Sequence, residues 1–183
     1  MSWEWWLAIA VFVVLVLFGV YLSMTAGRLD RLHQRIDTSL LTLDGHLLRR
    51  SAVSLELAAS GVLDPATSVL LAEAAHDART SSQTEDDARA LVESNLTAAL
   101  AAALDPEDVA EVDLTPDGSA LLDELASACR RVELSRRFHN DAVRACRQVR
   151  RQRMVRLFRL AGHTDWPETW EMDDSIPEGL VSR

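Results

Sequence analysis

The chain has 183 residues, of which 48% are hydrophobic, and its 19 basic and 28 acidic residues give a net charge of −9. This length suits one modest domain with an appendage. Every basic residue is an arginine, which excludes catalysis by a Schiff-base, P-loop or kinase-type lysine. The seven glycines do not cluster and no GxSxG or HExxH motif occurs. We therefore expect no enzyme activity, no cofactor and no catalytic or metal-binding residues.

Residues 5–27 form an uncharged run between Glu4 and Arg28. A bilayer core requires about 20 apolar helical residues, so the run predicts a transmembrane helix that places the chain in the lipid bilayer. Aromatic residues that favour membrane interfaces lie near both ends of this run: Trp3, Trp5, Trp6 and Tyr21. A cleaved signal peptide is the alternative, but it requires a basic start, a shorter apolar core and an A-x-A-like site. The acidic start and the long core favour a retained anchor.

Arginines follow the predicted span at Arg28, Arg31 and Arg35, and none precedes it. The positive-inside rule therefore predicts a single-pass protein of the cell membrane, with residues 1–4 outside and the rest in the cytoplasm. Cys129 and Cys146 are expected on one helix, about 25 Å apart, too far for a disulfide. Two free thiols fit a reducing compartment.

The rest of the chain carries helix signals and no alternating strand pattern. Residues 28–60 predict one helix, continuous with the span or following it, because leucines recur at three- and four-residue steps. Gly61 stands where a helix stop belongs. Asp64 and Pro65 predict an N-cap and a first helical position, opening a helix to about residue 81.

Further caps divide the second half of the chain. Thr84–Asp87 resembles a capping box at the start of a helix to Leu104. Asp105 and Pro106 repeat the cap-and-proline signal, residues 115–119 (TPDGS) predict a loop, and a last helix is expected over 120–160. Residues 28–160 are thus predicted to form an all-α, antiparallel bundle of long helices of the four-helix type, followed by an acidic tail, 161–183.

Two short segments carry a resemblance to a known family. Leu43–Arg50 (LDGHLLRR) is similar to the I-D-x-Q-L-x-R-R segment of LemA-family proteins, and Arg136–Val143 (RRFHNDAV) resembles the family's A-R-x-x-Y-N-x-A-V segment. The order also agrees, since both follow an N-terminal membrane helix. The resemblance implies a membrane-anchored helical bundle with its N-terminus outside, and it brings no established catalytic residues. The matched residues are expected to be structural: Asp44, Arg49, Arg50, Phe138 and Asn140.

The chain also departs from the family pattern. Ala52-Val53-Ser54 replaces L-I-P, His139 stands where tyrosine is usual, and Arg147-Gln148 replaces a second Y-N. His139 is expected to be a hydrogen-bonded core histidine, with a ligand or proton sensor as the alternative. A hydrogen bond from Asn140 to Asp44 or Arg49 would explain its place in a helix, and Gly45 suggests a close helix approach or a local bend.

The charges separate strongly along the chain. Residues 61–127 carry a net charge of −13, residues 128–160 carry +9 and residues 161–183 carry −5. We expect the arginines of 128–160 mainly to complement acidic faces of their own domain, with anionic lipid as the alternative. Nucleic acid is not expected to bind, because a net charge of −9 repels a polyphosphate.

The apolar stripe of the last helix, from Phe138 to Val149, breaks where arginines intrude. The acidic tail then offers three possibilities: it folds back with its tryptophans on the arginines, docks on another protein, or forms a disordered end. The residues expected to contact the tail, a partner or lipid are Arg150, Arg153, Arg156, Trp166 and Trp170.

These features predict a membrane-anchored cytoplasmic helical bundle that acts as an interaction or scaffolding module. Its partner would be an unidentified protein or a second copy of the chain. The alternative is a regulator of the membrane surface that binds anionic lipid through the arginine-rich end of its last helix.

Overall fold

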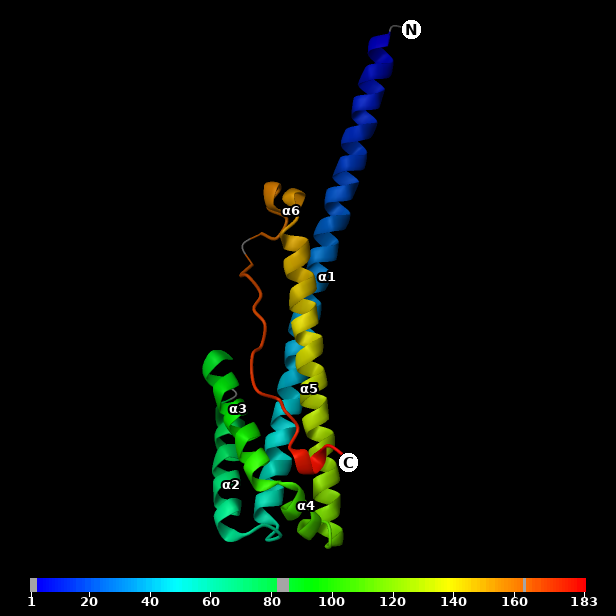
Figure 1. Ribbon diagram of the computed structural model, residues 1–183. Helices are drawn as coiled ribbons and strands as arrows, with labels where there is room; N and C mark the ends of the chain where they lie inside the picture. Colours follow the sequence, from blue (N-terminus) through cyan, green and yellow to red (C-terminus); the bar gives the residue numbers. More distant parts are fainter. Residues whose placement is uncertain (1–2, 82–85, 163) are drawn as a thin grey trace. The chain divides into compact units, whose positions relative to one another are not determined.

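The protein is described by a computed structural model that covers residues 3–81, 86–162 and 164–183, without the side chains of Asp86 and Asp87. Within these ranges the chain is helical and contains no strand, which confirms the predicted all-α class (Figure 1). In chain order the helices are α1 (Trp3–Ala59), α2 (Pro65–Thr80), α3 (Asp86–Ala103), α4 (Pro106–Val112), α5 (Pro116–Arg150), α6 (Arg153–Leu157) and the short 3-10 helix η2 (Glu178–Leu180).

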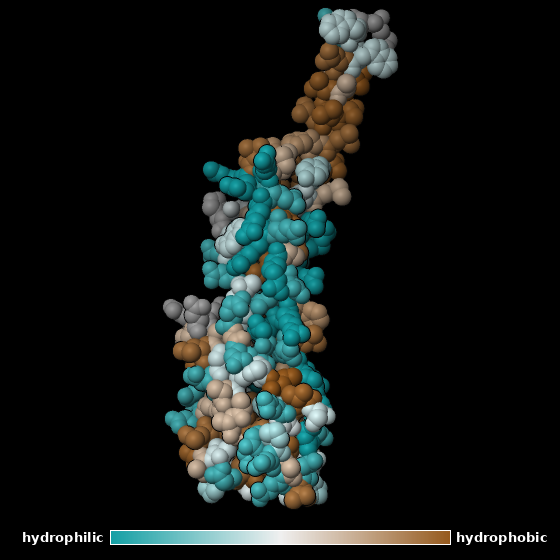
Figure 2. Space-filling model, in the orientation of Figure 1, coloured by the Kyte–Doolittle hydropathy of each residue, from teal (hydrophilic) through white to brown (hydrophobic). Residues whose placement is uncertain are grey.

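Helix α1 is unbroken over 57 residues, so the apolar run and the following leucine-patterned segment belong to one helix. Its N-terminal part contains a stretch long and apolar enough to cross a membrane, and none of that stretch is buried. Figure 2 shows this hydrophobic surface in brown along the N-terminal part of the chain. Gly61 has a φ of +76° and follows the end of α1, as predicted. Gly45 lies within α1 with open space around it, so the expected close helix approach there is wrong.

The two predicted aspartate caps are confirmed. Asp64 accepts hydrogen bonds from the backbone N–H groups of Ala66 and Thr67, at 2.9 and 3.2 Å, at the start of α2. Asp105 accepts from the N–H groups of Glu107 and Asp108, both at 2.9 Å, at the start of α4. A proline at the first helical position follows each cap because its missing N–H needs no partner there.

The predicted boundaries of the last helix were wrong at both ends. Residues 115–119 do not form a loop: Thr115 accepts a hydrogen bond from the Gly118 N–H at 3.1 Å, and α5 begins at Pro116. Helix α5 ends at Arg150 instead of continuing to residue 160, and the chain turns before α6. The turn lies where the apolar stripe stops, because arginines there leave no apolar face to bury. Thr84 and Glu85 of the predicted capping box lie outside the described residues.

The chain divides into two compact units, each built from separate stretches of sequence. Unit 1 comprises Met1–Thr38 and Asp141–Glu168, and unit 2 comprises Ser39–Asn140 and Thr169–Arg183. Unit 1 has a small core formed by Leu29, Cys146, Val149 and Val155. Both cysteines of the chain lie in α5, and both are buried and free, as predicted.

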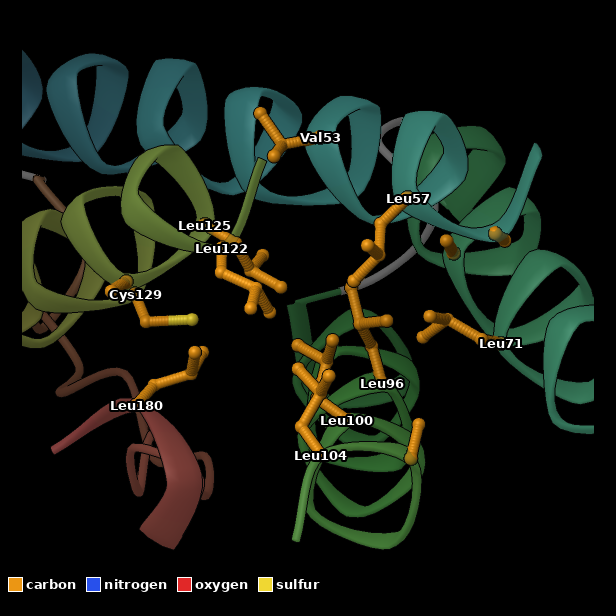
Figure 3. Packing of buried hydrophobic residues seen from close by; sticks show 14 of the residues in the cluster. Val53, Leu57, Leu71, Leu96, Leu100, Leu104, Leu122, Leu125, Cys129 and Leu180 are labelled. Carbon is orange, nitrogen blue, oxygen red and sulfur yellow. The ribbon is translucent and has the colours of Figure 1, made fainter. Parts of the chain in front are cut away.

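Unit 2 contains the larger hydrophobic core, to which α1, α2, α3, α4, α5 and η2 all contribute (Figure 3). Each fully buried leucine stabilises such a core by about 1.5–3 kcal/mol. The core side chains labelled in Figure 3 are Val53, Leu57, Leu71, Leu96, Leu100, Leu104, Leu122, Leu125, Cys129 and Leu180. Because Leu180 belongs to the C-terminal tail, part of the tail is core structure.

Candidate functional site

The paired arginines of the first motif have contrasting surroundings in unit 2. Arg50 is 1% exposed, and its guanidinium donates to Glu93 Oε2 at 2.7 Å and to Thr97 Oγ1 at 3.0 Å. Arg49 is exposed and forms an ion pair with Glu124. Asp44 forms an ion pair with Arg89 of α3. These contacts join α1 to α3 and α5, so all three motif residues have structural partners.

The buried pair of Arg50 and Glu93 is costly to desolvate. Burial raises the pKa of the Glu93 carboxyl, and the Arg50 guanidinium opposes this shift without cancelling it. A buried ion pair gains Coulomb energy but loses the hydration of both charges, so its net contribution to stability is small. The cost of removing only one partner is much larger, because the other charge stays buried.

Asn140 of the second motif holds the tail of unit 2. Its amide Nδ2 donates to the Trp170 carbonyl at 3.1 Å, and its Oδ1 accepts from the Trp170 N–H at 2.8 Å. The predicted partners of Asn140, Asp44 and Arg49, are therefore wrong. Trp170 is 5% exposed and packs with α1, α3 and α5 residues, and the Arg89 guanidinium lies 5.6 Å from its ring centroid.

The tail continues along unit 2 through further polar contacts. Thr97 donates to the Asp173 carbonyl at 2.8 Å, and the Asp173 N–H donates to Ser94 Oγ at 3.0 Å. Arg136 binds both carboxylate oxygens of Asp174, at 2.7 and 2.8 Å. Arg183 forms ion pairs with two aspartates of unit 2, Asp113 and Asp123.

In unit 1 the start of the tail lies against α5. Arg147 donates to the Pro167 carbonyl at 2.7 Å, and Arg150 donates to the Thr164 carbonyl at 2.7 Å. The Arg150 guanidinium lies 5.1 Å from the ring centroid of Trp166. The fold-back prediction is thus confirmed for Arg150. The same prediction is wrong for Arg153 and Arg156, because their side chains have no hydrogen-bond or ion-pair partner within the described part of the chain.

The α5 arginines pair with acidic residues of their own chain, as expected, but the described partners do not lie in the acidic middle segment, 61–127. Where their ion-pair partners are described, Arg136 reaches the tail, and Arg137 and Arg144 reach Glu133 and Asp141 of α5 itself. The acidic middle segment was expected to supply these partners. The tail and α5 supply them because both place carboxylates close to the arginine side chains; within α5 the partners are one helical turn apart.

Two other side chains of the second motif, His139 and Phe138, differ in burial. His139 is buried and its Nδ1 lies 3.1 Å from Ser39 Oγ, which confirms a hydrogen-bonded core histidine. Phe138 is 53% exposed, although the stripe pattern placed it on the buried face. In the described ranges no group of three or more His, Cys, Asp or Glu side chains could hold a metal ion.

A different group of arginines gathers in unit 1 beyond the end of α5. We name this group the arginine corner; its members are all exposed: Arg151, Arg153, Arg156 and Arg159. No ion pair or hydrogen bond of their side chains is found within the described ranges. Arg159 has a φ of +50° and Gly162 has a φ of +59°, so the chain reverses tightly after α6. Sequence reasoning identified Arg153 and Arg156 but did not single out Arg151 and Arg159.

Two apolar residues that lie between the arginines of the corner, Val155 and Phe158, pack against α1. The ring of Phe158 meets the ring of Phe18 edge-on, with centroids 5.3 Å apart. Val155 packs with Leu29 in the core of unit 1. Unit 1 holds ten arginines and six acidic residues, a net charge of +4, whereas unit 2 holds nine and 22, a net charge of −13. The positive unit is thus the one that contains the apolar stretch.

These features define an all-helical protein with one helix that could span a membrane and a cluster of exposed arginines beside it. No family model, no curated protein and no solved structure matches the chain. The similarity to the LemA family remains a hypothesis that rests on residues 43–50 and 136–143.

Proposed function

We propose that this is a single-pass membrane protein, anchored by residues 5–27, whose arginine corner binds anionic lipid headgroups. The flanking arginines favour an N-terminus outside and the remaining chain in the cytoplasm of a cell membrane. This assigns the protein to the membrane-surface regulators rather than to the scaffolds. No catalytic step is proposed.

One observation carries this proposal: Phe158 packs on Phe18, and exposed Arg156 and Arg159 lie within two residues of Phe158. If the apolar stretch of α1 lies in a bilayer, this contact holds the arginine corner at the membrane surface. Each arginine near an anionic surface contributes about 1 kcal/mol, so four arginines form a substantial electrostatic site. The net charge of −13 on unit 2 would instead oppose approach to anionic lipid.

The test uses the full chain reconstituted in vesicles of phosphatidylcholine and phosphatidylglycerol. Spin-labelled versions of both lipids report by electron paramagnetic resonance how much of each is immobilised by the protein. We expect phosphatidylglycerol to be preferred and the preference to fall as salt is added. The variant Arg153→Gln/Arg156→Gln should lower the relative affinity by up to about 30-fold, at about 1 kcal/mol per arginine.

The matched control is Arg79→Gln/Arg131→Gln, which removes two exposed arginines from unit 2. The control should keep the wild-type preference. Equal preference for the two lipids in the wild-type protein would refute the proposal. So would an equal loss in both double variants, because net charge alone would then explain the effect.

Scaffolding remains a second candidate because α2 and α3 present an apolar groove. The groove is lined mainly by alanine and leucine side chains: Thr67, Leu70, Leu71, Ala98, Ala99, Ala102 and Ala103. We infer an antiparallel four-helix-type bundle for unit 2, since the four longest helices, α1, α2, α3 and α5, all contribute to its core. Leu70→Glu should abolish cross-links to another protein, or to a second copy, in the membrane. Unchanged cross-links would remove this groove from consideration.

A further inference from the structure

Two exposed apolar side chains lie between arginines of the arginine corner, and headgroup binding does not explain them. Leu157 is 73% exposed and Phe158 is 43% exposed, and both are flanked by exposed arginines. A water-facing turn would gain nothing from these two residues. An element at a membrane interface does, because acyl chains accept the apolar groups while arginine side chains extend to the headgroups.

The position of α6 along α1 gives the depth of these side chains. The apolar run ends before Arg28, and Phe18 lies ten residues earlier, which is about 15 Å along a helix. A hydrocarbon core of about 30 Å takes about 20 helical residues, so a few of the 23 residues in the run lie outside it. Phe18 then lies roughly 10 Å inside the boundary of the hydrocarbon, at 1.5 Å per residue.

The covered face of α1 agrees with this placement. Phe18, Leu22, Thr25 and Leu29 are partly or fully covered, at the three- and four-residue spacing of one helix face. The remaining surface of α1 from Leu7 to Val20 is exposed. At its two ends this face contacts Phe158 and the core around Val155. Phe158, directly after α6, thus reaches a residue well inside the apolar run.

We propose that α6 inserts into the same membrane leaflet as the adjacent part of α1, with Leu157 and Phe158 among the acyl chains. The partner is the bilayer itself, and the arginine corner is held at headgroup depth by this insertion. The proposal rests on the proposed membrane anchoring, but the insertion does not require anionic lipid. It depends on the contact between Phe158 and Phe18, which is made within the protein.

The test places a bimane fluorophore on a cysteine at position 157 (Leu157→Cys) in the full chain and measures quenching by acyl-brominated phosphatidylcholine. The matched control is Leu134→Cys, an exposed leucine of α5 in unit 2. Native Cys129 and Cys146 are buried, and burial raises the pKa of both thiols, so the wild-type chain serves as the labelling blank. We expect at least about twofold stronger quenching at position 157, as for an element lying 5–10 Å into the interface.

The outcomes of these measurements distinguish the insertion of α6 from headgroup binding. Strong quenching at position 157 in pure phosphatidylcholine, reduced towards the control level by Phe158→Ala, supports an insertion held by the aromatic contact. Equal quenching at both positions overturns the insertion. Quenching that appears only with phosphatidylglycerol overturns it as well, since headgroup attraction would then supply the contact. If the wild-type protein showed no preference for phosphatidylglycerol but kept the strong quenching at position 157, headgroup binding would be refuted and the insertion would stand.

Discussion

Arg49 and Arg50 are neighbours in α1 that differ in one physical variable, access to water. Replacing Arg50 by methionine leaves the Glu93 carboxylate buried without its cation, and we expect a loss of about 3–5 kcal/mol of unfolding free energy. Arg49→Met breaks an exposed pair and should cost less than about 1 kcal/mol. Denaturant unfolding of the full chain in detergent, followed by circular dichroism, measures both. Similar losses would show that Arg50 is hydrated in solution.

The Glu93 carboxyl should also impose a pH dependence on stability. Its pKa is raised above the ordinary value of 4.5, mainly by burial, so the folded state binds its proton more tightly than the unfolded chain does. The stabilisation that comes from this tighter proton binding is complete below pH 4.5 and is lost as the pH rises through the raised pKa. The wild-type protein should therefore lose stability relative to Glu93→Gln as the pH rises above the ordinary pKa of 4.5. A difference in melting temperature that is constant with pH would contradict this.

The burial of Arg50 and the partner of Asn140 could not be predicted from the sequence. Arg49 and Arg50 are the same residue type, so only their positions on the helix distinguish the exposed one from the buried one. Arg50 lies three residues after Leu47 and four before Ser54, and therefore on the same buried face of α1. Asn140 was expected to bond to side chains of the first motif, but it binds the backbone of Trp170. A backbone group offers no residue-type signal, so such a partner is visible only in the fold.

At the scale of elements, the tail of unit 2 depends on Asn140. Asn140→Ala leaves the buried N–H and carbonyl of Trp170 without partners, which we expect to cost about 2–3 kcal/mol. Hydrogen exchange over residues 169–174 should rise sharply. The neighbouring Asp141→Ala removes an exposed pair with Arg144 and should leave that exchange unchanged. Equal exchange in the two variants would mean that other contacts hold the tail.

The ends of α1, α2 and α3 were predicted to within one residue, whereas both ends of α5 were missed. The starts of α2 and α4 followed from Asp64 and Asp105, since a cap and a proline act locally. The start of α5 was missed because its cap, Thr115, precedes a proline-aspartate-glycine run that is typical of turns. The end of α5 depends on what its arginines meet in three dimensions. A broken apolar stripe indicated a change near Val149 but not whether the helix would stop.

At the scale of the whole molecule, the chain passes between the two units three times, after Thr38, Asn140 and Glu168. Deleting residues 1–27 removes nothing from unit 2, so its thermal unfolding should change by no more than about 2–4 °C, the effect of about 1 kcal/mol. The same deletion removes Phe18, and hydrogen exchange over residues 153–162 should increase. Collapse of unit 2 in this fragment would show that the units are not independently stable.

The placement of Leu180 in a core with Val53 has a consequence for the order of events during synthesis. At a translation rate of about 5–20 residues per second, Leu180 is synthesised roughly ten seconds after Val53. During that time α1 is complete, and core leucines that pack on Leu180 face water. A chain inserted early through its apolar helix would spend this interval tethered at a membrane surface, separated from other unfinished chains. Tethering would thereby limit aggregation at the stage when the nascent protein is most exposed.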